Sequence, residues 1–163
     1  MRDKYRKNEG YVLIEAIIAI TIAVVGLLGI FALLSRSLSL NRVVADRFVA
    51  SYLAAEGIEI VKNLVDNNIL AGKPWNKNLS SGSYEADYTD TGLVPDSSRF
   101  INVNGETGAY GYAELVPTLM KRQLVIRNSV DGEEITINSR VDYTTRGGGK
   151  FSVSIEDHLF NWR

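Results

Sequence analysis

The chain has 163 residues, enough for one domain of ordinary size, and its formal net charge of −1 offers no broad basic surface for nucleic acid. It contains no cysteine, which excludes a structural disulfide, a cysteine-ligated zinc site and a lipoprotein cleavage site. Hydrophobic residues make up 45% of the chain, which is ordinary, but many of them lie in one N-terminal block.

The N-terminal block begins after a polar, basic segment. The first ten residues read MRDKYRKNEG, and an apolar stretch follows at residues 11–34. Glu15 is the one charged residue in this stretch, and residues 16–34 carry no charge. Because about 20 apolar residues span a bilayer core as a helix, the stretch is long enough to cross a membrane. The basic flank before it and the mostly neutral flank after it favour a cytoplasmic N-terminus.

Three interpretations of this block compete. A secretory signal peptide would have a shorter apolar core and an A-x-A site after it, and no A-x-A occurs in residues 11–34. A single-pass anchor that is not processed explains the length and the charges but not Glu15. A carboxylate inside a spanning helix costs roughly 2.5–3.5 kcal/mol at the centre and less near the edge. Glu15 lies near the edge and still needs a partner.

The third interpretation supplies that partner. The stretch GYVLIE at residues 10–15 resembles the leader junction of type IV prepilins and type II secretion pseudopilins, although the family usually has Phe in place of Tyr11. The resemblance implies that a prepilin peptidase cuts after Gly10, that Tyr11 is then N-methylated, and that Glu15 neutralises the N-terminal amine of a neighbouring subunit. An ammonium and a carboxylate, each costly alone in apolar surroundings, are tolerable as a pair.

The resemblance also implies a role and a set of partners. The chain would be a structural subunit, not an enzyme, of a type IV pilus or a type II secretion pseudopilus, with no cofactor. Its partners would be the prepilin peptidase, other pilin subunits, an inner-membrane platform protein, an assembly ATPase and membrane lipid. It would enter the inner membrane with its C-terminal part outside and then join a filament. The stretch AAEGIE at residues 54–59 resembles the stem of minor pilins and favours a minor subunit.

The apolar block continues into an amphipathic segment, which we call the stem (residues 35–70). No proline occurs before Pro74, and Asn67, Asn68 and Gly72 are further stop signals, so we expect one helix from Tyr11 to about residue 66. Gly26 and Gly29 within the apolar half permit either close helix packing or local unwinding. One side of the stem carries an apolar stripe at helical spacing, formed by Val49, Ala50, Leu53, Ala54, Gly57, Ile58, Val61, Leu64 and Val65.

The remaining residues, 71–163, which we call the head, have the pattern of an antiparallel sheet. Apolar and polar residues alternate at 134–144 and 151–156, and residues 124–126 suggest a preceding strand. Asp131-Gly132 and residues 147–149 mark the turns of this three-stranded meander. Residues 84–89 and 99–103 are weaker strand candidates with a turn at residues 104–105, and we expect residues 157–163 to fold back onto the sheet. The predicted fold is α+β and pilin-like, a long N-terminal helix packed on a small antiparallel sheet.

No catalytic constellation is evident. His158 is the only histidine, which with the absence of cysteine excludes a Cys-His pair, and the GGGK stretch at residues 147–150 lacks the following Ser or Thr of a phosphate loop. Some major pseudopilins bind calcium in a loop, and Asp87, Asp90 and Asp96 are weak candidates for such a site, although their spacing matches no known calcium loop. Four tyrosines of the head are candidates for an adhesive surface or for packing, namely Tyr84, Tyr88, Tyr110 and Tyr112.

Overall fold

The structure, a computed structural model, describes residues 6–161 of the chain, with side-chain burial described from Gly10 onward. The predicted leader covers residues 1–10, and side-chain burial is described for only the last of these residues. The chain divides into two units, the first ending at Arg42 and the second beginning at Val43. Within residues 6–161, one helix is followed by seven strands: α1 (Arg6–Leu70), β1 (Gly82–Glu85), β2 (Val94–Pro95), β3 (Ile101–Val103), β4 (Tyr110–Gly111), β5 (Val116–Asn128), β6 (Glu134–Thr144) and β7 (Lys150–Phe160).

The end of α1 follows the predicted stop signals. Gly72 adopts a φ of 65°, a left-handed conformation that glycine adopts without steric cost. The N–H groups of Gly72 and Lys73 donate to the carbonyls of Ile69 and Asn68 at 3.0 and 2.9 Å, so the last turn of the helix has hydrogen-bond partners. The helix extends four residues beyond the predicted end at residue 66, because these bonds keep residues 67–70 helical.

The predicted meander is confirmed. Strands β5, β6 and β7 pair antiparallel in order, and β6 has the predicted bounds. Gly132 and Gly148, at φ 74° and 81°, make the two turns. The expected fold-back of residues 157–163 is wrong for residues 157–160, because these residues continue β7 and pair with β6. Residues 162–163 lie outside the described part of the chain.

Four shorter strands complete the sheet. β1 pairs with β5 and β2, and β3 pairs with β5 and β4, all antiparallel. The strand predicted at 84–89 overlaps β1 only at residues 84–85, because the chain turns after Glu85, and the one predicted at 99–103 is found at Ile101–Val103. β5 is much longer than predicted, with 13 residues, because its first part pairs with β3 and its second part with β1.

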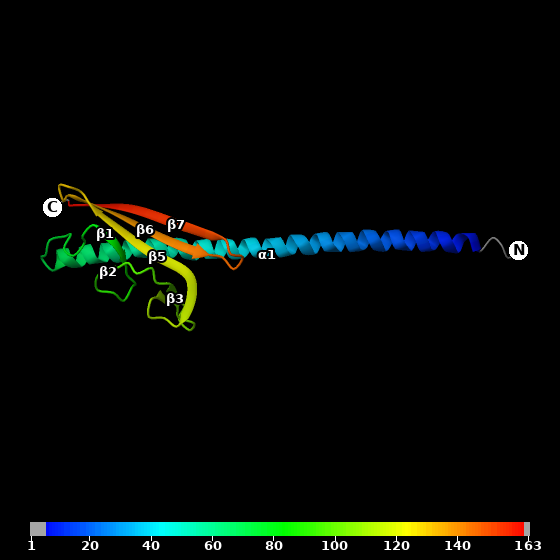
Figure 1. Ribbon diagram of the computed structural model, residues 1–163, viewed down its shortest axis with the longest axis horizontal. Coiled ribbons are helices and arrows are strands. Elements are labelled where there is room, and N and C mark those ends of the chain that lie inside the picture. The colour runs from blue at the N-terminus through cyan, green and yellow to red at the C-terminus, as the bar shows by residue number, and fades with distance from the viewer. Residues whose placement is uncertain (1–5, 162–163) are drawn as a thin grey trace. The chain divides into compact units, whose positions relative to one another are not determined.

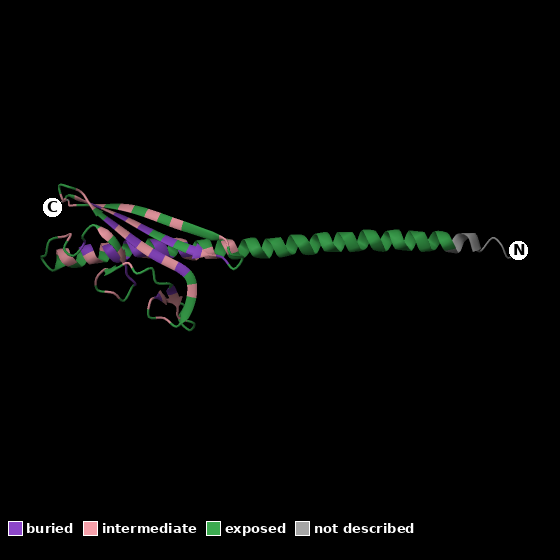
Figure 2. Ribbon diagram, viewed as in Figure 1, coloured by how far each residue is buried: buried purple, intermediate pink, exposed green. Residues whose placement is uncertain are grey.

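The second part of α1 packs across the inner face of β5 and β6, as predicted (Figure 2). Gly57 lies at the closest approach. A Cβ atom there would lie 2.4 Å from Ser139 Oγ and 2.7 Å from Leu124 Cδ2, so only glycine lets the helix lie this near the sheet. The core comprises two clusters of buried residues, the first being Ile58, Ile60, Val61, Val65, Leu79, Ala86, Leu124, Ile126, Ile135 and Ile137, and the second Ala50, Leu53, Ala54, Ile101, Met120, Val141 and Tyr143.

Candidate assembly site

The three residues of the predicted processing junction lie on the first turns of α1. Gly10, Tyr11 and Glu15 are helical and exposed, and a Cβ atom at Gly10 would meet nothing within 4 Å. Tyr11 and Glu15 are four residues apart, so their side chains lie one turn apart on the same side of the helix. No hydrogen bond or ion pair joins Glu15 to another residue among 10–161.

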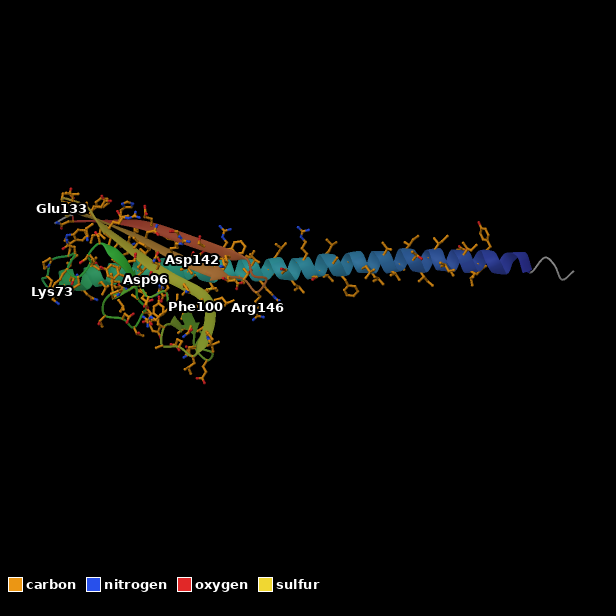
Figure 3. All side chains as sticks on the ribbon, in the orientation of Figure 1. Lys73, Asp96, Phe100, Glu133, Asp142 and Arg146 are labelled. Atoms are coloured by element: carbon orange, nitrogen blue, oxygen red, sulfur yellow. The ribbon has the colours of Figure 1, made fainter. Side chains whose placement is uncertain are left out.

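The helix around Glu15 is apolar on every side. Its large hydrophobic side chains are all exposed in the chain by itself, with exposed fractions from 48% at Val24 to 77% at Tyr11 (green in Figure 2). Figure 3 shows side chains that project above and below this part of α1. Within the described residues, α1 is the one helix long and apolar enough to cross a membrane. A helix that is apolar all round is stable where lipid or other helices surround it, and Glu15 is the exception within that surface.

The head contains a buried polar cluster that the sequence analysis did not single out. Arg122 of β5 has only 3% of its surface exposed. Its guanidinium donates to Glu56 Oε2 at 2.8 Å and to Leu53 O at 2.9 Å, and it also bonds the carbonyl of Ala86. One side chain therefore joins the stem helix to the connection after β1. A signal existed, because Arg122 occupies an inward position in the alternation of Met120, Leu124 and Ile126.

A buried acid lies beside this cluster. Glu85 is 1% exposed and accepts from Arg99 Nε at 2.6 Å and Ser97 Oγ at 2.7 Å. The Arg99 guanidinium also lies 4.4 Å from the ring centre of Tyr112. Burial raises the pKa of Tyr112 to about 12, so this phenol is neutral at physiological pH. The contacts fix the connection between β2 and β3 against β1.

The calcium candidates do not converge on one site. Asp87 and Asp90 share a turn, in which the Asp87 N–H donates to Asp90 Oδ2 at 2.8 Å. Both oxygens of Asp87 accept internal bonds, from Thr89 and from the Tyr112 N–H at 2.9 Å. Asp96, labelled in Figure 3, instead accepts from Ser98 and Gln123. In the described residues, no group of three or more His, Cys, Asp or Glu side chains is placed to hold a metal ion.

The internal bonds of Asp87 predict a dependence of stability on pH. Burial opposes ionisation of Asp87, but hydrogen bonds from Thr89 and Tyr112 outweigh it and lower the pKa below the ordinary 3.8. A carboxylate with a lowered folded-state pKa stabilises the fold above its unfolded pKa, and this contribution is lost as the pH falls through the folded pKa. We expect Asp87→Asn to flatten the loss of stability below about pH 4 and to cost about 1–3 kcal/mol at neutral pH.

The measurement is the free energy of unfolding of the full chain in detergent as a function of pH, followed by tryptophan fluorescence. Asp66→Asn, a change at an exposed acid on the stem, is the matched control and should keep the wild-type slope. Asp131 and Asp157 also have lowered pKa values, so part of the slope should remain in this variant. An Asp87→Asn chain with the full wild-type slope would contradict the prediction.

The other candidate residues contact neighbouring residues of the head. His158 lies on β7, with Nδ1 2.5 Å from Glu134 and Nε2 3.5 Å from Glu156, and the bond to Glu134 raises its pKa. The GGGK stretch forms the β6–β7 turn. The four tyrosines do not form one exposed surface: Tyr88 is exposed, whereas Tyr84, Tyr110 and Tyr112 are partly buried against the core or within the polar cluster.

Comparisons with known proteins add no family assignment. No protein-family model matches the sequence, and no curated protein and no solved structure matches it significantly.

Proposed function

We propose that this chain is a pilin-like structural subunit that is cut after Gly10, N-methylated on Tyr11 and polymerised through the apolar half of α1. The proposal includes insertion in the inner membrane with a cytoplasmic N-terminus and the head outside. A prepilin peptidase, a platform protein, an assembly ATPase and other pilin subunits would act on it or join it in a type IV pilus or a type II secretion pseudopilus. The subunit has a structural rather than a catalytic role.

The observation that carries the proposal is the position of Glu15. It is the only charge in residues 11–34, it lies one helical turn after Tyr11, and α1 presents it on an apolar surface. An unpaired carboxylate in such surroundings is costly, so its presence favours a cationic partner. Cleavage after Gly10 creates a suitable cation, the N-terminal ammonium of residue 11.

The geometry of α1 supports an intermolecular pair. An ammonium at the first residue of a helix faces the positive end of the helix dipole, so a nearby carboxylate stabilises it. If Glu15 of one subunit lies beside the amine of the next, the pair fixes the axial register of the two helices. The apolar surface of residues 11–34 then leaves water and packs among neighbouring helices. Gly26 and Gly29 leave room on the helix surface for close approach.

The test is the N-terminus of the mature protein, expressed in full length with a prepilin peptidase. Mass spectrometry should find N-methyl-tyrosine as the first residue, and Gly10→Ala should abolish the cut. Gly92→Ala, at a head glycine with no neighbour within 4 Å of its Cβ position, is the matched control and should be processed normally. An intact Met1 in the wild-type protein would sink the proposal and favour the alternative, a single-pass anchored binding module without processing.

A further inference from the structure

The sheet ends on one side in a long open edge, strand β7 (Figure 1). β7 pairs with β6 over 11 residues without a register shift, and within residues 6–161 no strand pairs with its other side. The remaining edges, β2 and β4, have two residues each, and β2 ends in Pro95. Short strands and prolines are common protections against unwanted pairing, and β7 has neither.

Two hydrogen bonds at the ends of β7 show which backbone groups are free. Thr145 N–H donates to Gly149 O and Asn161 N–H donates to Glu133 O, both at 2.9 Å and both in the register of the β6–β7 ladder. The backbone groups that bond the partner alternate along an antiparallel strand. The N–H and C=O groups of the odd-numbered residues of β7 therefore point toward β6, and those of the even-numbered residues point away from it. The N–H of His158 is already bonded to Asp157, so the open stretch is centred on residues 152–156.

The side chains along this edge are also incompletely covered. The inward residues of β6, such as Ile137 and Val141, are fully buried, whereas Val153 and Ile155 of β7 are only half-buried. A strand added beyond β7 would cover these two side chains. Its inward residues therefore need to be apolar, and a basic residue opposite Glu156 would form a cross-strand pair.

The chain itself contains this pattern at the start of β7. Residues 150–153 read KFSV, which is basic, apolar, polar and apolar. We propose that β7 of one copy pairs antiparallel with β7 of a second copy, about a two-fold axis through Val153. This register pairs Lys150 with Glu156, Phe151 with Ile155, Ser152 with Ser154, and Val153 with its own symmetry mate.

The neighbouring register is less favourable. A shift by one residue moves the axis to Ser154 and places Lys150 opposite His158 and Phe151 opposite Asp157. In the proposed register Asp157 falls opposite Gly149, which has no side chain, so its ion pair with Lys62, at 2.7 Å, is kept. Charge and apolar complementarity therefore select the same register.

The pairing has a directional consequence. Val153 packs on the core cluster that contains Leu53, and Leu159 packs on the cluster that contains Val65, so β7 runs in the same direction as the stem beneath it. Antiparallel β7 strands therefore make the two stems antiparallel. Subunits of one filament all point the same way, so under the proposed function this contact joins subunits of two separate filaments or membranes. The pairing itself requires only the folded head and does not rest on the proposed function.

The absence of cysteine permits a direct test by cross-linking. In the proposed register the two Val153 residues form a pair without mutual hydrogen bonds, with Cα atoms about 4.5 Å apart, which is within the range that a disulfide spans. We expect the full-length Val153→Cys protein in detergent to form a disulfide-linked dimer on mild oxidation. Two control variants should link at least about tenfold less. Ser154→Cys lies on the β7 edge but is out of register with its symmetry mate, and Arg140→Cys lies on β6, away from the edge.

Charge exchange separates this pairing from association through the apolar helix. Lys150→Glu and Glu156→Lys should each reduce the cross-linking of Val153→Cys roughly two- to tenfold, and the double exchange should restore it. Circular dichroism checks that each variant is folded. A monomeric Val153→Cys protein, equal linking at all three cysteine positions, or a double exchange that does not restore linking would overturn the proposal.

Discussion

Replacing Arg122 with methionine is expected to lower the free energy of unfolding of the head by about 3 kcal/mol. Methionine keeps much of the length of the side chain but has no charge and no donor. The change leaves the carbonyl of Ala86 without this donor, and it removes the cation that faces Glu56 and that lowers the pKa of Asp87. A buried acceptor without a partner costs about 1–3 kcal/mol, and the loss of charge compensation adds to that cost.

The measurement is chemical unfolding of the full chain in detergent, followed by the fluorescence of the tryptophans, of which Trp75 packs against the core. Arg140→Met is the matched control. Arg140 lies on the outer face of β6 and pairs with Asp142, and 52% of each of these two side chains is exposed. That change should stay within about 0.5 kcal/mol of the wild type. Equal unfolding free energies for the two variants would show that the buried cluster does not stabilise the head.

The elements that the sequence predicted share a strong local signal. The stripe from Val49 to Val65 predicts the buried side of α1, and its members are buried or half-buried in the structure. The alternation at residues 134–144 gives β6 with the observed bounds. In the stem helix and in β6, apolar residues recur at the spacing of the one face that packs against the core. The local sequence pattern and the tertiary contacts therefore agree.

The parts that the sequence did not predict depend on contacts between distant residues. The first half of β5 becomes a strand because β3 pairs with it, and β2 and β4 are two-residue pairings without a periodic signal. The burial of Arg122 depends on Glu56 and Ala86, which lie 66 and 36 residues away in the chain. The end of β7 carries Asp157 inward, which the apolar pattern does not anticipate, and Lys62 of the stem compensates that charge.

The candidate assembly site was predicted from the spacing of Gly10, Tyr11 and Glu15 and not from a periodic pattern. The structure adds that these residues are exposed and that Glu15 lacks a partner in the described part of the chain. Glu15 has no partner among residues 10–161, and the apolar surface around it is uncovered. The apolar surface is costly in water and the unpaired carboxylate is costly in lipid, whereas an assembly that supplies apolar neighbours and a cation accommodates both. Under the proposed function, one event accounts for both features, namely the packing of this helix against another subunit.

Removing the Glu15 carboxylate should consequently separate membrane insertion from assembly. We expect Glu15→Ala to insert as well as the wild type or better, because a charge is removed from the spanning segment. We expect its incorporation into filaments to fall at least about tenfold, because each neighbouring ammonium would then be buried without a counter-ion, and a loss of 1.4 kcal/mol per contact already gives that factor.

The measurement compares the amount of the subunit in sheared filaments with the amount in the membrane, in cells that carry the complete assembly machine. Glu59→Ala, at an exposed glutamate of the same helix, is the matched control and should assemble normally. Glu15→Gln keeps a hydrogen-bond acceptor of the same shape without the charge, so it should assemble poorly if charge neutralisation matters and well if only shape does. Normal incorporation of Glu15→Ala would mean that the carboxylate has no role in the packing of α1, and the isolated charge would then need another cationic partner within the membrane.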